Sequence, residues 1–140
     1  TYKEANPIKH NKNTGKITFY WYPKCSTCKN AKAWLEANEI PYEAIDMIKE
    51  VPTKAQLLQW ITSSGLPARR FFNTSGMKYR ELGLKEKVPT LSNEEAAALL
   101  ATDGMLIKRP LLISEDRFLI NGFKEKEYEG VLLESWKRNV

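Results

Sequence analysis

The chain has 140 residues, of which 42% are hydrophobic and 28% are charged, and its formal net charge is +5. This composition is typical of a single globular domain. No apolar run is long enough to span a membrane, and residues 1–16 are too polar for a signal peptide, so we expect a cytoplasmic protein without membrane contact. The positive charge would suit anionic partners, but Lys and Arg are scattered, which argues against direct nucleic-acid binding.

Residues 1–16 are polar and lack hydrophobic periodicity, so we expect a flexible N-terminal extension. His10, the one histidine of the chain, lies in this extension and is expected to be solvated rather than catalytic. Residues 17–140 are long enough to bury a core and are expected to form one domain.

A strand is predicted at residues 17–21, which are β-branched and aromatic. A helix is predicted at about 27–38, where apolar residues recur at helical spacing. Ser26 and Thr27 are suited to cap the start of this helix. Between the strand and the helix, the segment YPKCSTCK at 22–29 contains the only two cysteines of the chain.

The position of Cys25 at a helix start predicts a reactive thiol. The positive end of the helix dipole stabilises a thiolate, and Lys24 and Lys29 add positive charge, so we expect a lowered pKa and a nucleophilic role for Cys25. Cys28 lies one turn into the helix and should be more buried. It is suited to attack a mixed disulfide on Cys25 and close a Cys25–Cys28 bond.

Two other interpretations of the cysteines remain open. The first is half of a zinc site, but zinc requires four ligands and His10 is the only other soft donor. The second is a pair of inert core residues, although the strand–loop–helix context favours reactivity. No metal or other cofactor is expected.

A second strand is predicted at about 42–46, which with the first strand and helix gives a parallel pair joined by a right-handed crossover. A helical insert follows at about 52–106. Two capping boxes, Thr53–Gln56 and Ser92–Glu95, open helices within it. Gly65 and Pro67 end the first of these helices.

The final third changes to strand periodicity. Strands are predicted at 111–113 and 118–120, joined as a hairpin, and an amphipathic helix is predicted at about 124–136. The resulting order, β-α-β, helical insert, β-β-α, predicts an α/β fold with a mixed four-stranded sheet and flanking helices. A Cys-x-x-Cys after the first strand of a βαβ unit is typical of a thioredoxin-like redox motif.

Over about residues 17–133 the chain resembles the arsenate reductase / Spx-type family, which has a thioredoxin fold with an inserted helical subdomain. Four regions carry the resemblance. They are CSTCKNA at 25–31, WLE at 34–36 with IPY at 40–42, GLPAR at 65–69 with YRELGL at 79–84, and KRPLL at 108–112.

The resemblance implies roles for individual residues. Cys25 matches the family's nucleophile, and Arg69 and Arg109 match arginines that hold an oxyanion beside it, as planar guanidinium groups do by charge-assisted hydrogen bonds. Arg70 is equally compatible with a solvated surface residue. Pro110 matches a proline that is cis and faces the cysteine loop.

Two departures from the family's arsenate reductases concern the substrate. Glutathione-dependent members have one essential cysteine, whereas Cys28 supplies a second here, as in the Spx-type regulators. These enzymes also use a third arginine in the last hairpin, and Arg117 falls short of that position. Arsenate as the physiological substrate is therefore in question.

Two functions follow from the resemblance. The first is a thiol–disulfide oxidoreductase that reduces arsenate or another small oxidised substrate and is recycled by thioredoxin or by glutaredoxin and glutathione. The second is a Spx-like redox regulator that binds RNA polymerase, in which Gly65 matches a glycine that contacts polymerase. The insert sequence around residues 66–72 is closer to the reductase branch.

Overall fold

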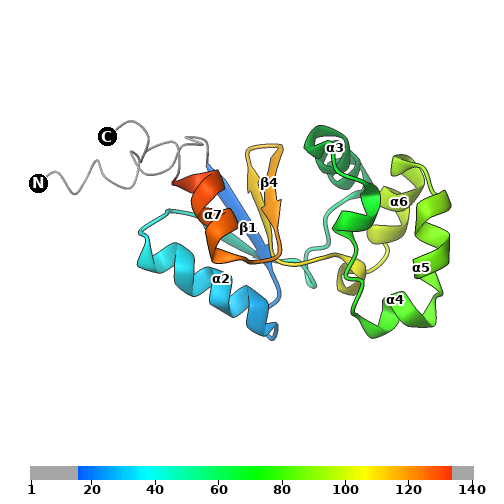
Figure 1. Ribbon diagram of the computed structural model, residues 1–140, viewed down its shortest axis with the longest axis horizontal. Coiled ribbons are helices and arrows are strands. Elements are labelled where there is room, and N and C mark those ends of the chain that lie inside the picture. The colour runs from blue at the N-terminus through cyan, green and yellow to red at the C-terminus, as the bar shows by residue number, and fades with distance from the viewer. Residues whose placement is uncertain (1–15, 134–140) are drawn as a thin grey trace, which may run out of the picture.

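A four-stranded mixed sheet forms one part of the molecule in the computed structural model, which describes residues 16–133 (Figure 1). Its strand order is β2-β1-β3-β4. The strand β1 (Ile17–Trp21) pairs in parallel with β2 (Glu43–Asp46) and antiparallel with β3 (Leu111–Ser114), and β3 pairs antiparallel with β4 (Arg117–Asn121). The mixed sheet predicted from the sequence is therefore confirmed.

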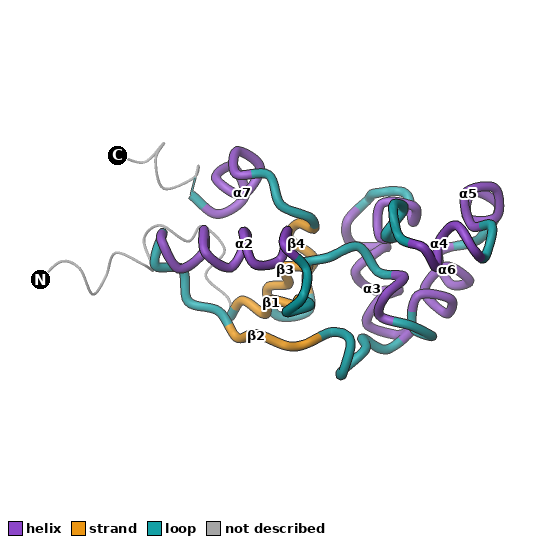
Figure 2. Tube along the Cα trace, turned by 90° about the horizontal axis from the view of Figure 1, so that it is seen from below, coloured by secondary structure: helices purple, strands orange, loops and turns teal. Residues whose placement is uncertain are grey.

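Two helices cover one face of the sheet. Figure 2 shows α2 (Ser26–Ala37) and α7 (Glu125–Leu132) on the same side of the strands. Ile17 and Phe19 point to this side because alternate residues of a strand face the same way. The buried residues of this core also come from α2, from the sheet and from α7, and include Leu35, Leu112 and Tyr128.

The opposite face packs against the helical insert between β2 and β3. A second core joins the sheet residues Tyr20, Leu111 and Ile113 to the insert, where Trp60 is buried and contacts the Tyr20 ring at a centroid distance of 5.2 Å. The insert consists of α3 (Lys54–Ser64), η2 (Ala68–Phe71), α4 (Met77–Glu81), α5 (Leu84–Lys87), η3 (Val88–Thr90), α6 (Asn93–Leu100) and η4 (Gly104–Leu106).

The capping signals in the insert were predicted correctly. Thr53 and Gln56 form a capping box at the start of α3, and Ser92 and Glu95 form another at the start of α6. Gly65 ends α3 in the left-handed conformation, with a φ of 71°, which suits a residue without a side chain.

The predicted cap of the first helix was wrong. Cys25 occupies the N-cap of α2, Ser26 is already the first helical residue, and no side chain caps this helix by a hydrogen bond. The reason is that the turn closes one residue earlier than expected, with the Cys25 N–H donating to the Tyr22 carbonyl at 2.9 Å. The catalytic candidate thus stands where a capping side chain would otherwise be.

Part of the sequence-based predictions lies outside the described residues. This applies to all of the expected N-terminal extension except Lys16, to His10, and to the end of the helix predicted at 124–136. Between residues 16 and 133, no helix is both long and apolar enough to cross a membrane.

Candidate functional site

Cys25 lies at the junction of β1 and α2, partly exposed and with a free thiol. Partial burial by itself raises the pKa of this thiol. The backbone N–H and thiol of Cys28 and the positive charge of Arg109 outweigh that effect, so that the pKa of Cys25 is lowered from its ordinary value. A lowered pKa was predicted from the sequence, but Cys28 and Arg109 contribute more to it than the flanking lysines do. The lowered pKa makes Cys25 the more nucleophilic thiol.

Cys28 has the opposite electrostatic environment. It is fully buried in the first turn of α2 and is also a free thiol. Burial raises its pKa to about 12, and the neighbouring Cys25 adds to this increase. The Tyr22 N–H donates to the Cys28 sulfur at 3.5 Å. The two thiols are therefore differentiated, one tending to ionise and the other held protonated.

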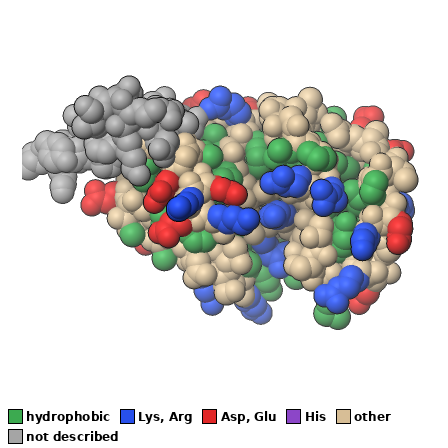
Figure 3. Space-filling model, viewed as in Figure 1, with side chains coloured by type: hydrophobic (Ala, Val, Ile, Leu, Met, Phe, Trp, Pro, Cys, Tyr) green, Lys and Arg blue, Asp and Glu red, His purple; other side chains and the backbone are tan. Residues whose placement is uncertain are grey.

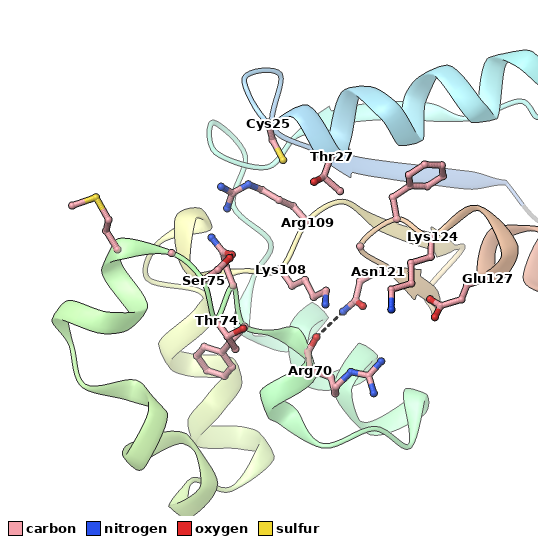
Figure 4. Close-up of a pocket in the computed structure, with 16 residues that line it drawn as sticks. Cys25, Thr27, Arg70, Thr74, Ser75, Lys108, Arg109, Asn121, Lys124 and Glu127 are labelled. Atoms are coloured by element: carbon pink, nitrogen blue, oxygen red, sulfur yellow. Dashed lines mark hydrogen bonds between the residues drawn. The ribbon is translucent and has the colours of Figure 1, made fainter.

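Arg109 comes from the segment that enters β3 and extends toward Cys25 (Figure 4). Its guanidinium carbon lies 5.3 Å from the centroid of the Tyr22 ring, in a cation–π arrangement. Its Nη1 donates to the Met105 carbonyl at 3.5 Å, and its buried Nε has no hydrogen-bond partner among residues 16–133. The Arg109–Pro110 peptide bond is cis, as the resemblance implied.

Cys25 opens onto a cleft of about 620 Å³ between the sheet and the insert. The sheet side contributes residues around Arg109 and the loop that follows β4, and the insert side contributes the loop that precedes α4. Figure 3 shows Lys and Arg side chains gathered across the middle of the molecule, where these two parts meet.

Four cationic side chains line this cleft, and they are Arg70, Lys108, Arg109 and Lys124. Glu127 is the only acidic residue among the described residues that line it. Such a surface favours an anionic ligand next to the nucleophile.

Buried hydrogen bonds fix the wall formed by the loop after β4. The Asn121 side-chain amide donates to the Arg70 carbonyl at 2.8 Å, and the Tyr128 hydroxyl donates to the Gly122 carbonyl at 2.7 Å. Gly122 has a φ of 70°, and a Cβ at this position would lie only 3.0 Å from Cε of Lys108. The Lys108 side chain therefore passes close to Gly122 because this residue lacks a side chain.

The structure brings only some of the predicted site residues together. Cys25 and Arg109 line the cleft near each other, and Cys28 is buried next to Cys25. Arg69 is exposed and is not among the cleft-lining residues, whereas its neighbour Arg70 is. Gly65 is exposed at the end of α3 and is likewise not a cleft residue.

Several cleft residues were not singled out from the sequence. Lys108 stands beside the motif residue Arg109, which was a usable signal. Lys124 and Asn121 carry no such signal, because only the return of the chain through β4 places them opposite the cysteine loop.

Among residues 16–133, no three His, Cys, Asp or Glu side chains are grouped as a metal site would require. His10, the additional soft donor considered for zinc, lies outside these residues.

A β-α-β, β-β-α sheet with a Cys-x-x-Cys at the start of its first helix defines a thioredoxin-fold protein with a thiol-based site. More specifically, the chain belongs to the ArsC family, whose family model matches residues 20–131. The family resemblance described from the sequence is thereby confirmed.

The similar proteins include a transcriptional regulator and a possible arsenate reductase. "Uncharacterized protein YusI" of Bacillus subtilis is 49% identical over 120 residues, covering 86% of this chain and 98% of YusI. The global transcriptional regulator Spx of Streptococcus agalactiae is 26% identical over 122 residues, covering 87% of each chain. The crystal structure of "a possible arsenate reductase" from Streptococcus mutans is 52% identical with a TM-score of 0.75, covering 79% of this chain and 92% of that one.

Proposed function

We propose that the protein is a cytoplasmic thiol–disulfide oxidoreductase in which Cys25 is the nucleophile and Cys28 the resolving thiol. One observation carries the proposal: Cys25, with a lowered pKa, lines a cation-rich cleft, and Cys28, with a raised pKa, is buried next to it. The partly satisfied guanidinium of Arg109 is placed to hold an anionic group beside Cys25. Of the two arginines before Phe71, only Arg70 is among the described residues that line the cleft.

The reaction requires the two thiols to act in order. The Cys25 thiolate attacks the oxidised atom of the substrate and forms a covalent bond to it, displacing a leaving group. The negative charge on Cys25 is one cause of the raised pKa of Cys28, and the attack removes this charge. Cys28 then loses its proton more readily. Its thiolate attacks the Cys25 sulfur, and the bond between Cys25 and the substrate breaks with transfer of two electrons to the substrate.

With arsenate as the oxidant, this sequence releases arsenite and leaves a Cys25–Cys28 disulfide. An external dithiol, such as thioredoxin or a glutaredoxin recycled by glutathione, would reduce this disulfide and complete the cycle. The similarity to "a possible arsenate reductase" supports arsenate as the first substrate to assay.

The test is arsenate-dependent oxidation of NADPH in the presence of thioredoxin and thioredoxin reductase. We expect turnover that is abolished in Cys25→Ser and strongly reduced in Cys28→Ser. If there is no turnover but a Cys25–Cys28 disulfide forms under mild oxidant, the substrate is a different one or the protein is a redox switch. If neither turnover nor disulfide is detected, the proposed chemistry is wrong.

A second candidate function is a redox-sensing regulator that binds RNA polymerase. The similarity to Spx favours it, and so does the exposure of Gly65 at the end of α3. Co-purification of RNA polymerase with the tagged protein, lost in Gly65→Arg, would support this function. Because Gly65 is not among the residues that line the cleft, the same variant should leave any reductase activity unchanged, provided that thermal unfolding shows it to be folded.

A further inference from the structure

The cleft is larger than the ligand assigned to its cysteine end. Its volume of about 620 Å³ falls in the range of roughly 300–1,000 Å³ typical of sites for whole small molecules. A tetrahedral oxyanion held between Cys25 and Arg109 would fill only one end. The remaining space is large enough for a larger ligand.

The remaining wall carries three cations that do not act on Cys25. In Figure 4, Arg109 extends toward Cys25, whereas Arg70, Lys108 and Lys124 lie farther from the thiol. None of these three forms an ion pair with another described residue. Glu127 is the one acidic residue among the described residues that line the cleft, so positive charges outnumber negative ones there, and a bound anion would relieve their mutual repulsion.

The segments that carry the three cations are fixed by contacts with the rest of the fold. The Asn121 amide ties η2, which contains Arg70, to the end of β4. The Lys108 N–H donates to the Phe71 carbonyl at 2.9 Å, and its side chain passes close to Gly122. Lys124 is the N-cap residue of α7. Segments far apart in sequence thus present their charges into one cleft.

We propose that Arg70, Lys108 and Lys124 form a second anion subsite, and that the substrate is a low-molecular-weight disulfide bearing carboxylate groups away from its sulfur atoms. The sulfur meets Cys25 while a carboxylate lies among the three cations. This inference rests on the proposed function and specifies its substrate class, in preference to a bare oxyanion.

The substrate disulfide is the oxidant in this reaction and accepts the two electrons that the Cys25–Cys28 dithiol loses. The Cys25 thiolate attacks one sulfur of the substrate, the S–S bond breaks, and the other half leaves as a thiolate that takes up a proton from water. Cys28 gives its proton to solvent, attacks the Cys25 sulfur and displaces the second half as a thiolate, which is protonated in turn. One disulfide is reduced to two thiols, and the Cys25–Cys28 dithiol is oxidised to a disulfide.

The experiment compares three disulfides of different charge as oxidants of the fully reduced protein. They are glutathione disulfide, which is anionic, bis(2-hydroxyethyl) disulfide, which is neutral, and cystamine, which is cationic. The rate of Cys25 oxidation is followed by quenching with an alkylating agent and mass spectrometry. In R70Q/K108Q/K124Q we expect the rate with glutathione disulfide to fall about tenfold or more, from loss of charge-assisted contacts. The rate with the neutral disulfide should stay within about twofold, because it does not need the subsite.

The matched control is K49Q/K85Q/K87Q, which removes the same charge from exposed residues that do not line the cleft. It should preserve the preference for the anionic disulfide. An equal loss of preference in the control would mean general electrostatic attraction and would overturn the subsite. The three single variants, checked by thermal unfolding, separate loss of binding from loss of fold.

The outcomes distinguish the two proposals. If Cys25 reacts with the neutral disulfide and the cleft variants do not alter its preference among the three oxidants, the subsite is wrong and the proposed function stands. If Cys25 reacts with no disulfide but supports arsenate turnover, the substrate class is wrong and the proposed function stands. If neither reaction occurs, both are wrong.

Discussion

The Arg109 guanidinium lies over the Tyr22 ring, with 5.3 Å between its central carbon and the ring centroid. Tyr22 also donates its N–H to the Cys28 sulfur and accepts the Cys25 N–H at its carbonyl. One residue therefore contacts the Cys28 thiol and the Cys25 backbone through its own backbone, and it contacts the Arg109 guanidinium through its side chain. The ring positions Arg109, and Arg109 in turn lowers the pKa of Cys25.

Replacing Tyr22 tests this arrangement. Tyr22→Leu removes the aromatic face, and a cation–π contact of about 0.5–1 kcal/mol corresponds to a roughly two- to fivefold slower reaction of Cys25 at neutral pH. Tyr22→Phe retains the ring and should react like the unchanged protein. The measurement is the rate of iodoacetamide alkylation of Cys25 against pH. A midpoint that moves equally in both variants would assign the effect to the hydroxyl instead of the ring.

The two thiols should lose their protons at different pH values. Because the pKa of Cys25 is lowered, its thiolate persists below the pH at which an ordinary cysteine is protonated, and its reactivity is lost only as the pH falls through the lowered pKa. Arg109→Gln should move this loss to higher pH. Ultraviolet absorbance of the thiolate in a Cys28→Ser background provides the measurement, and no movement in Arg109→Gln would contradict the assigned cause.

The opposite behaviour is expected of Cys28. With a pKa raised to about 12, it should remain protonated and unreactive at neutral pH. In Cys25→Ser, alkylation should therefore be negligible near pH 7 and should rise only in strong alkali. Rapid modification near pH 7 would show that Cys28 is neither buried nor electrostatically suppressed. Unfolding in denaturant should restore ordinary reactivity, which serves as the control.

The Tyr128 hydroxyl should be important for stability and for the cleft. It is fully buried and donates to the Gly122 carbonyl at 2.7 Å. Tyr128→Phe leaves that carbonyl without this donor, so we expect a decrease of about 1–3 kcal/mol in the free energy of unfolding by urea. A decrease of similar size in Tyr42→Phe, whose hydroxyl bonds to exposed Glu36, would show that burial is not the cause.

Gly104 joins the insert to the sheet side of the molecule. A Cβ at this position would lie 2.5 Å from the Met47 carbonyl oxygen, just after β2. Gly104→Ala must displace backbone, and overpacking of this kind costs about 1–3 kcal/mol in chemical denaturation. Gly130→Ala is the matched control, because its added Cβ would have nothing within 4 Å and alanine favours the helix. Equal stability of the two variants would contradict this close packing.

Arg69 and Arg70 give opposite expectations for one experiment. The family resemblance points to Arg69, whereas the cleft is lined by Arg70. We therefore expect Arg70→Gln to slow oxidation by glutathione disulfide by several-fold, and Arg69→Gln to change it by less than twofold. The reverse result would restore the sequence-based assignment. The adjacent positions and identical charge change make each variant the control for the other.

Much of this protein was determined by local sequence. The Cys-x-x-Cys between an apolar strand and an amphipathic helix predicted which thiol ionises, because a helix start favours a thiolate and the next turn is buried. The capping boxes at Thr53 and Ser92 predicted two helix starts, since they need only residues three positions apart. The parallel pairing of the first two strands followed from hydrophobic periodicity and the short strand–helix–strand unit, and the hairpin of the last two followed from the short connection between them.

Only the tertiary structure decided which charges share a cleft with Cys25. Arg69 and Arg70 are adjacent in sequence, and nothing local distinguishes them; the orientation of η2 on the sheet places the second at the cleft. Lys124 is brought there by the return of the chain after β4, and Tyr22 became a positioning residue because Arg109 crosses its ring. These contacts join positions far apart in the chain, so periodicity and motif spacing contain no information about them.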